Sequence, residues 1–294
     1  MQRTHVPANL AALRRRRRLR RILSIGIEQL VLAAVAVLFL IPFLWLIITS
    51  LKPIDQVFTS PPQWIPEPVM WSNYVDALGS PAFPFFLLLR NTLFYVVLST
   101  IGVLLSGALV AYGFARMDFW GKDTLFAITL STMMLPGIVT LIPTYILFRW
   151  LGWVGSYAPL IVPAFFGSAF NIFLLRQFFL TIPWELTDAA KVDGAGDLRV
   201  FWQIMMPLVK PALLVVGVLN FMYTWNDFFG PLIYLTKSSE YPLVMGLYAF
   251  QTQHGIQWNL MMAASLAVAF PIILLFFFAQ RYFIEGITLT GLKG

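Results

Sequence analysis

The chain has 294 residues, of which 59% are hydrophobic and only 11% charged, and it contains 27 phenylalanines and no cysteine. Its mean hydropathy of +0.79 sets it apart from a soluble domain, in which roughly half of the residues are apolar and about a quarter charged. The composition predicts an integral membrane protein, and a chain without cysteine has no disulfides and no thiolate metal sites.

The first 21 residues form a basic tail with eight arginines, five of them consecutive from Arg14 to Arg18. The apolar run from Ile22 to Leu51 is much longer than the roughly 7 to 15 residues of a signal peptide's hydrophobic region, so we expect an uncleaved first span. The net charge of +7 does not indicate binding to nucleic acid, because the arginines of this tail would hold it in the cytoplasm beside anionic lipid.

Six segments offer about 20 uncharged residues in succession, the length at which a helix crosses about 30 Å of hydrocarbon. Lipid offers no partner to unpaired backbone groups, so only helices fit these lengths. The segments lie within residues 29–51, 91–115, 124–148, 150–175, 207–234 and 258–280. The sequence therefore predicts an all-α protein with six transmembrane helices over residues 22–284 and a short tail over residues 285–294.

Two kinds of residue suggest how these helices pack. Small residues at four-residue spacing in the second span allow helices to approach closely, and they are Gly102, Ser106, Gly107 and Ala111. Prolines inside or at the ends of the third and fourth spans predict bent helices, and they are Pro136, Pro143, Pro159 and Pro163.

The orientation follows from the distribution of basic residues. A cytoplasmic amino terminus places the basic tail, residues 116–123, residues 176–210 and the carboxyl terminus on one side. These segments hold sixteen of the twenty Lys and Arg residues, which is the bias that the positive-inside rule expects. Both termini are therefore expected in the cytoplasm, with the loops 52–87 and 235–257 outside.

A charged stretch, residues 183–207, interrupts the apolar chain between the fourth and fifth spans. Leu186, Ala189 and Ala190 fall at i, i+3 and i+4, so they predict a short helix with one narrow apolar face that a second protein can approach. Glu185 lies at the amino end of this helix, where the helix dipole favours a carboxylate.

The second half of this charged stretch predicts another helix. Gly194 and Gly196 interrupt the first helix, Asp197 is placed to cap the second, and Pro207 marks the entry to the fifth span. The apolar face of this second helix is expected at Leu198, Phe201, Trp202 and Met205. The segment therefore reads as a helix, a glycine turn and a helix.

The same segment contains a longer pattern: Asp188-Ala189-Ala190, three residues, Gly194, nine residues, Ile204, one residue and Met206-Pro207. This pattern resembles the EAA loop of the membrane subunits of ABC importers. Because the resemblance implies coupling to an ATPase, we call residues 183–207 the coupling segment. The surrounding IPWEL and DGA resemble the version in carbohydrate importers, specifically in the maltose-type second permease subunit. Asp188 stands where the family usually has Glu and Met206 where it usually has Leu, and both changes preserve charge sign or apolarity. The coupling residues that the resemblance implies are Glu185, Asp188, Ala189, Ala190, Asp193, Gly194, Ala195, Ile204 and Pro207.

The fifth span holds unusual polar residues, Asn220, Tyr223, Asn226 and Asp227. Asn220, Tyr223 and Asp227 share a face at helical spacing, and polar groups in a membrane normally turn towards the protein interior or water. These residues are the candidate substrate path. An alternative is that Asp227 ends the helix at the outer surface while Asn220 bonds a neighbouring helix. The stretch WNDFFGPLIYL also resembles the corresponding segment of sugar permeases, and EGITLTGLKG at the end of the chain resembles the cytoplasmic tail that reaches the ATPase dimer.

The resemblance implies a permease subunit of an ATP-driven ABC importer in a bacterial or archaeal cell membrane, forming half of the path of a sugar or oligosaccharide. The sequence has no Gly-x-x-x-x-Gly-Lys-Ser/Thr loop to hold ATP phosphates, so we do not expect an enzyme. ATP and Mg would be held by a partner ATPase dimer, and this chain would bind no cofactor or metal. The other implied partners are a homologous second permease subunit, an extracytoplasmic solute-binding protein and membrane lipid.

Several alternatives stay open at this stage. The solute could be another polar molecule, such as glycerol phosphate or a polyol, and the coupling segment could be a helix pair that rests on the membrane surface. A channel or secondary transporter would leave the coupling segment unexplained. The residues from Gly194 to Asp197 also spell the Gly-x-Gly-Asp of intramembrane aspartyl proteases. Such enzymes need two facing carboxylates, whereas Asp197 lies in a charged loop and Asp227 near the opposite side of the membrane.

Overall fold

The computed structural model describes the backbone of residues 8–253 and 257–291, with side chains over 21–248, at 250 and over 257–280. Every regular element in this described part is helical. The chain forms two compact units, Met1–Asn73 with Trp258–Ala263, and Tyr74–Gln257 with Ala264–Gly294.

The first unit contains α1 (Ala8–Ser50), the 3-10 turn η1 (Ile54–Gln56), the start of α2 (Ser72–Leu78) and the first turns of α14 (Trp258–Gly291). The side chains of α1 are exposed from residue 21 to residue 44, as expected of a helix that lipid or another subunit covers. The helix is long and apolar enough to span a membrane over Arg21–Ser50, which agrees with the predicted first span.

A buried amide pair fastens the end of α1. Asn73 donates from Nδ2 to the carbonyls of Ser50 and Lys52, at 2.9 Å each, and Asn259 donates to Lys52 O at 3.3 Å and to Asn73 Oδ1 at 3.2 Å. The Lys52 ammonium is buried and lies 4.3 Å from the ring centre of Trp45, and burial lowers the pKa of Lys52. This network gives the carbonyls after α1 the partners that a helix end lacks.

Besides most of α2 and α14, the second unit contains the remaining helices and short turns. They are α3 (Phe85–Arg116), α4 (Lys122–Ser131), η2 (Thr132–Met134), α5 (Gly137–Trp150), α6 (Ala158–Ile161), η3 (Val162–Phe166), α7 (Ala169–Thr181), α8 (Glu185–Val192), α9 (Asp197–Val200), the π-helical turn η4 (Phe201–Met205), α10 (Met206–Leu208), α11 (Lys210–Trp225), α12 (Phe229–Tyr234), η5 (Ser238–Glu240) and α13 (Leu243–Gln253).

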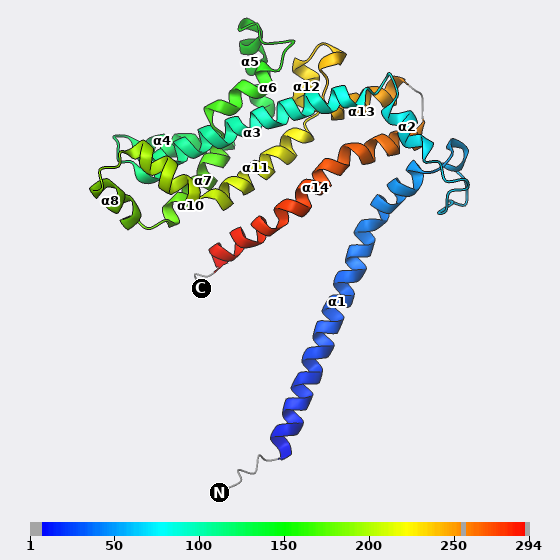
Figure 1. The fold of residues 1–294 in the computed structure, drawn as a ribbon, viewed down its shortest axis with the longest axis horizontal. Helices are drawn as coiled ribbons and strands as arrows, with labels where there is room; N and C mark the ends of the chain where they lie inside the picture. The colour runs from blue at the N-terminus through cyan, green and yellow to red at the C-terminus, as the bar shows by residue number, and fades with distance from the viewer. Residues whose placement is uncertain (1–7, 254–256, 292–294) are drawn as a thin grey trace. The chain divides into compact units, whose positions relative to one another are not determined.

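The helix α3 is the centre of this unit and packs against α7, η3 and α11 (Figure 1). Figure 1 also shows α8 beyond the carboxyl end of α3, and α13 beside its amino end. At the amino end, the backbone N–H of Leu243 donates to the Thr92 hydroxyl at 2.8 Å. The two ends of α3 therefore lie near different parts of the chain.

The small residues of α3 permit close packing, as predicted. A Cβ on Gly102 would come within 2.8 Å of the Phe165 ring, so only glycine fits against η3. The Ser106 hydroxyl donates to Ala164 O at 2.9 Å. Both contacts bring η3 against the small-residue face of α3.

The structure supports four to six of the predicted spans, and some of them are bent. Among the described residues, four helices are long and apolar enough to span a membrane, and two further pairs of helices would each make a span if a bend is allowed. One pair bends by 101° between Met134 and Gly137, around Pro136, and the other by 76° between Leu208 and Lys210. The bend at Pro136 confirms the predicted effect of this proline.

Two predicted boundaries are wrong. The fourth span is not within residues 150–175 but runs over Ala158–Thr181, because a turn with left-handed glycines at Gly152 and Gly155 follows α5. The fifth span does not continue to Tyr234, since α11 ends at Trp225 and α12 is a separate short helix.

Candidate coupling surface and solute path

The coupling segment folds as two helical pieces around a glycine turn, as predicted. Gly194 has a φ of +81°, a conformation that costs other residues free energy because of their Cβ. The turn is closed by the bonds from Gly194 N to Lys191 O, at 3.0 Å, and from Ala195 N to Ala190 O, at 2.9 Å. Ala195 lies partly buried against the core.

The predicted apolar face of α8 requires a correction. Ala190 is only 9% exposed and belongs to the core that also contains Val200 and Phe201, whereas Ala189 is exposed. The two alanines therefore lie on different sides of α8, because adjacent helical residues are about 100° apart. The face of α8 that is available to a second protein contains Leu186 and Ala189 but not Ala190.

The predicted cap of the second helix is also corrected. Asp197 is the first residue of α9 and its side chain makes no capping bond. Instead, Asp197 Oδ1 accepts a hydrogen bond from Lys191 Nζ at 3.1 Å. This hydrogen bond raises the pKa of Lys191. The ion pair links the two sides of the glycine turn.

The remaining predicted coupling residues occupy different environments. Glu185, Asp188, Asp193 and Pro207 are exposed, whereas Ile204 is partly buried and packs against the core. The charged residues of the segment therefore point away from the bundle and the apolar Ile204 towards it.

An exposed apolar surface, not fully predicted from the sequence, surrounds the turn. Its members, with their exposed fractions, are Trp184 (49%), Leu186 (43%), Val192 (88%), Leu198 (69%) and Trp202 (50%). Val192 lies outside the predicted i, i+3, i+4 pattern. It is exposed because it is the last residue of α8, directly before the glycine turn. A concentration of apolar side chains in a charged loop is typical of an interaction surface.

The four residues of the candidate substrate path do not share one environment. Asn220 donates to Thr100 Oγ1 of α3 at 3.0 Å, and Asp227 Oδ2 accepts from the Tyr95 hydroxyl of α3 at 2.8 Å. Tyr223 is 76% exposed, while Asn226 is exposed and its amide donates to a carbonyl of its own helix, one turn back. Asn220 therefore bonds a neighbouring helix, as the alternative interpretation of this residue predicted.

Asp227 also organises the chain after α11. Because α11 ends at Trp225, Asp227 stands on the connection to α12 and not on the helix itself. Its Oδ1 accepts from the backbone N–H of Gly230 at 3.0 Å, so the carboxylate stabilises the first turn of α12 while its other oxygen bonds α3.

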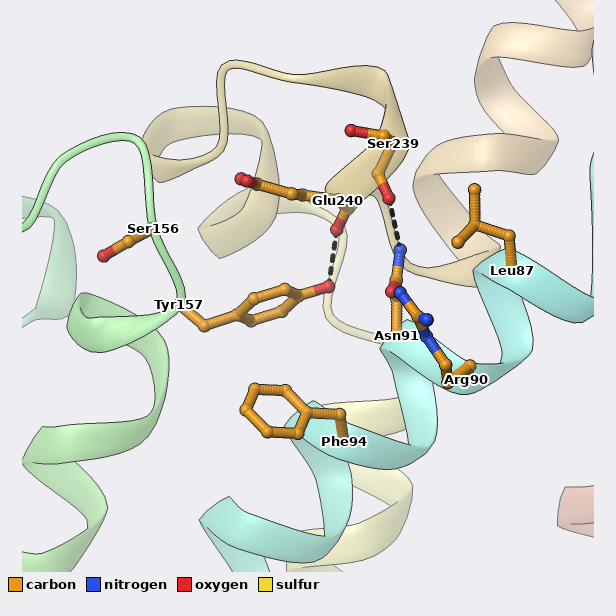
Figure 2. Close-up of a pocket in the computed structure, with 8 residues that line it drawn as sticks. All are labelled: Leu87, Arg90, Asn91, Phe94, Ser156, Tyr157, Ser239 and Glu240. Atoms are coloured by element: carbon orange, nitrogen blue, oxygen red, sulfur yellow. Dashed lines mark hydrogen bonds between the residues drawn. The ribbon is translucent and has the colours of Figure 1, made fainter.

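A pocket of about 630 Å³, which the sequence did not predict, lies at the amino end of α3 (Figure 2). We call it the Arg90 pocket. Its lining residues come from α3, from the turn before α6 and from η5, and they are Leu87, Arg90, Asn91, Phe94, Ser156, Tyr157, Ser239 and Glu240. Residues so distant in sequence share no local pattern that could have revealed the pocket.

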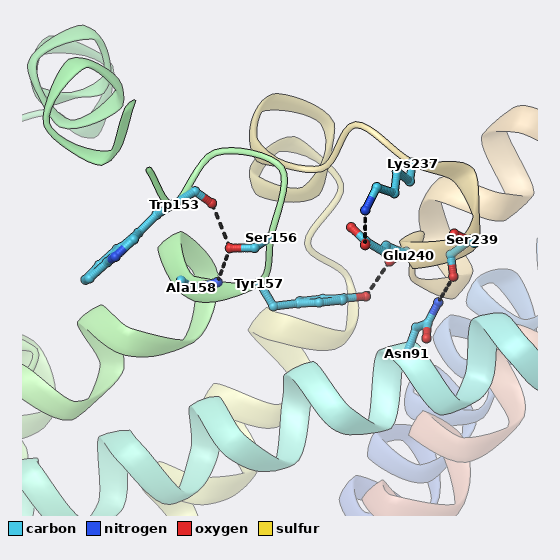
Figure 3. A network of polar contacts seen from close by, with 8 residues as sticks. All are labelled: Asn91, Trp153, Ser156, Tyr157, Ala158, Lys237, Ser239 and Glu240. Carbon is cyan, nitrogen blue, oxygen red and sulfur yellow. Dashed lines mark hydrogen bonds and ion pairs between the residues drawn. The ribbon is translucent and has the colours of Figure 1, made fainter. Parts of the chain in front are cut away.

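Hydrogen bonds fix the walls of the Arg90 pocket (Figure 3). Asn91 donates to Ser239 O at 2.8 Å, and the Tyr157 hydroxyl donates to Glu240 O. Burial raises the pKa of Tyr157, and the Glu240 carboxylate raises this pKa further, so the hydroxyl keeps its proton at neutral pH. Lys237 lies 3.4 Å from Glu240 Oε1.

Aromatic contacts connect the pocket to the candidate path. The Tyr157 ring lies 5.6 Å from the Phe94 ring and 6.0 Å from the Tyr95 ring, measured between centroids. Tyr95 is the residue that bonds Asp227. The pocket and the carboxylate of Asp227 are therefore neighbours across two tyrosines. Among the described residues, no group of three or more His, Cys, Asp or Glu could hold a metal ion.

Comparisons with known proteins show which family the chain belongs to. The family model described as "Binding-protein-dependent transport system inner membrane component" matches residues 102–288. The arabinooligosaccharides transport system permease protein AraQ of Bacillus subtilis is 32% identical over 263 residues, which cover 88% of this chain and 92% of AraQ. The sn-glycerol-3-phosphate transport system permease protein UgpE of Yersinia pestis is 34% identical over 239 residues, covering 79% of this chain and 85% of UgpE.

A solved structure shows the same fold. One chain of a bacterial ABC transporter involved in the import of the acidic polysaccharide alginate superposes with a TM-score of 0.80, at 24% sequence identity, over 90% of this chain and 97% of that chain. Together with the family model and the curated relatives, this establishes that the chain belongs to the binding-protein-dependent transport system inner membrane components, the permease subunits of ABC importers.

Proposed function

We propose that this permease forms half of the translocation path for a sugar or oligosaccharide and that the coupling segment docks onto a separate ATPase. The observation that carries the docking proposal is the exposed apolar surface around the glycine turn, where Val192 is 88% and Leu198 69% exposed. Apolar side chains in a charged loop gain free energy when a partner covers them, at about 25 cal/mol per Å² removed from water. The solute class is supported by the similarity to AraQ.

In this proposal, the bent pair Lys122–Met134 with Gly137–Trp150 serves as the third span and α11 alone as the fifth, so that six spans make up residues 22–284. The coupling segment joins the fourth span to the fifth. The basic tail of residues 1–21 and the tail of residues 285–294 both lie in the cytoplasm. The ATPase dimer supplies ATP and Mg, a homologous second permease forms the other half of the path, and an extracytoplasmic binding protein delivers the solute.

The solute path includes the exposed Tyr223 and the polar groups at Asn226 and Asp227, with Asn220 supporting them from α11. The Arg90 pocket extends this path towards the outer surface, because Tyr157 of the pocket packs against Tyr95, the partner of Asp227. Aromatic rings together with a few convergent polar groups are typical of small-molecule sites.

A second candidate solute is a small phosphorylated or acidic molecule. It is supported by the similarity to UgpE and by the exposed guanidinium of Arg90 in the pocket wall, since arginine binds phosphate and carboxylate groups with paired hydrogen bonds. Uptake of radiolabelled arabino-oligosaccharide and of glycerol 3-phosphate by proteoliposomes with the complete transporter separates the two candidates.

Co-purification tests the docking surface. We expect Val192→Glu and Leu198→Glu to leave the permease inserted at normal amounts but to release the ATPase, because a carboxylate must be desolvated to be buried in an apolar interface. Gln203→Glu is the matched control, since it adds the same charge at an exposed position of the same segment. Asp188→Asn should have a mild effect, because exposed ion pairs contribute only about 0 to 1 kcal/mol. An ATPase that stays bound to both docking variants would instead favour a helix pair that rests on lipid.

A further inference from the structure

The carboxyl end of α3 carries a buried arginine that bonds the end of α7. Arg116 is the last residue of α3 and is 5% exposed. Its Nε and Nη2 donate to Phe179 O, at 3.1 and 2.6 Å, and Nη2 also donates to Ile182 O. The last carbonyls of a helix lack partners within it and attract positive charge. Arg116 therefore supplies the carboxyl-terminal cap of α7.

A second arginine makes the reciprocal bond. Arg176 of α7 donates from Nε to Phe114 O, in the last turn of α3, at 3.2 Å. Its guanidinium lies 4.1 Å from the ring centre of Phe126 of α4. Each helix therefore provides the arginine that bonds the carboxyl-terminal carbonyls of the other, which holds the ends of α3 and α7 at a fixed separation.

The same end of α3 also holds the coupling segment. The Arg116 guanidinium lies 4.5 Å from the ring centre of Trp184, and the carbonyl of Trp184 accepts the first backbone bonds of α8, from Thr187 N and Asp188 N. One turn earlier on α3, Tyr112 donates its hydroxyl to Asp197 O at 3.4 Å. Its ring lies 5.1 Å from the Phe201 ring.

Thus α3 contacts the coupling segment at the start of each of its two helices. Arg116 contacts Trp184, which directly precedes α8, and Tyr112 contacts Asp197, the first residue of α9. In the described part of the chain no carboxylate lies within 4 Å of Arg116. A buried guanidinium without a carboxylate is costly, and a leucine would fill the space without that cost. What the guanidinium adds is a set of directional bonds combined with a flat stacking surface.

We propose that Arg116 is a positioning residue that makes α3 and the coupling segment move as one body when the ATPase closes. The inference rests on the proposed coupling function, and it names the route by which coupling reaches the solute path. With 32 residues, α3 is about 48 Å long. At its other end, Asn91 bonds Ser239 O and Tyr241 O. A displacement of the coupling segment is therefore delivered to the wall of the Arg90 pocket.

The test reads movement at one end of α3 while the other end is altered. The chain has no cysteine, so Ser239→Cys provides a single exposed thiol that leaves the Ser239 backbone bond in place. The complete transporter is reconstituted in lipid nanodiscs, and the labelling rate with a charged maleimide is measured without nucleotide and after trapping with ATP and vanadate. We expect trapping to change the rate several-fold in the permease that carries Ser239→Cys alone.

We expect Arg116→Lys, added to Ser239→Cys, to abolish this change although vanadate still traps the ATPase, because an ammonium keeps the charge but loses the paired bonds and the stacking. Arg199→Lys is the matched control, an exposed arginine of the coupling segment, and should retain the full change. The inference is overturned if adding Arg116→Lys leaves the response to trapping intact. It is equally overturned if trapping does not change the labelling rate of the Ser239→Cys permease before Arg116 is altered.

The docking surface itself is tested by co-purification with Val192→Glu and Leu198→Glu, so the proposed function and this inference can fail separately.

Discussion

Two adjacent alanines of α8 have opposite roles. Ala189 is exposed and lies on the side that a partner can reach, whereas Ala190 is 9% exposed within the core. We expect Ala190→Trp to reduce the amount of folded permease, because overpacking a core typically costs about 1 to 3 kcal/mol. Ala189→Trp should insert normally and lower ATPase affinity at least about tenfold, which is about 1.4 kcal/mol. Quantitative immunoblotting and co-purification separate the two effects, and equal behaviour of both variants would contradict the assignment of faces.

The two glycines of the turn offer an equally sharp contrast. Gly194 has a φ of +81°, whereas Gly196 has a φ of −75°, and a Cβ at either position would meet open space. A side chain at Gly194 is therefore opposed by backbone strain alone, of about 1 to 3 kcal/mol. We expect Gly194→Val to insert but to abolish uptake and loosen the ATPase, while Gly196→Ala remains close to normal in both assays. Undiminished ATPase binding and uptake in Gly194→Val would contradict the role of the turn in coupling.

At the scale of elements, α11 combines a structural side and an exposed side. Asn220 bonds Thr100 of α3, but Tyr223 is 76% exposed and contributes little to packing. Tyr223→Ala should therefore alter solute uptake several-fold while assembly and basal ATPase activity persist. Phe86→Ala, a similarly exposed ring of α3 at 79%, is the control and should leave uptake unchanged. Normal uptake after substituting Tyr223, Asn226 and Asp227 together would exclude this face from the path.

The element boundaries show what a sequence can and cannot specify. Apolar runs locate the spans, because lipid demands a minimum length of uncharged helix, and a proline such as Pro136 marks a break since it removes a backbone donor. Hydropathy does not predict the end of α11 at Trp225, because the apolar character of the chain resumes directly after Asp227 and continues to Tyr234. After the end of α11, Asp227 makes one tertiary bond, to Tyr95 of α3, and one local bond, to the backbone N–H of Gly230. Neither bond can be predicted from hydropathy.

The candidate sites divide in the same way. The two helical pieces and the glycine turn of the coupling segment could be predicted because the charges, glycines and spacing that specify them are local. The orientation of Ala190 could not be, since it depends on contacts with Val200 and Phe201. The Arg90 pocket and the bonds of Arg116 to the end of α7 join residues more than 60 positions apart. Such groups of residues come together only when the helices pack, so the periodicity of the sequence does not predict them.

At the scale of the whole molecule, orientation in the membrane decides what every site can do. Basic residues gather in the segments assigned to the cytoplasm, and a coupling segment must meet its ATPase there. The chain has no cysteine, so single cysteines report orientation without a background. Ser239 is exposed in the loop between α12 and α13, and Ser24 is exposed near the basic tail. The Ser24 hydroxyl bonds the carbonyl of Arg21 in its own helix, so its replacement disturbs no packing between helices.

We therefore expect an impermeant maleimide to label Ser239→Cys in intact cells and to leave Ser24→Cys unlabelled. Opening the cells should make both thiols reactive, which controls for a thiol that is merely covered by protein. The reverse pattern would place the coupling segment outside the cell. No ATP is supplied on that side of the membrane. This one result would therefore contradict three proposals together: the coupling surface, the direction of transport and the role of α3.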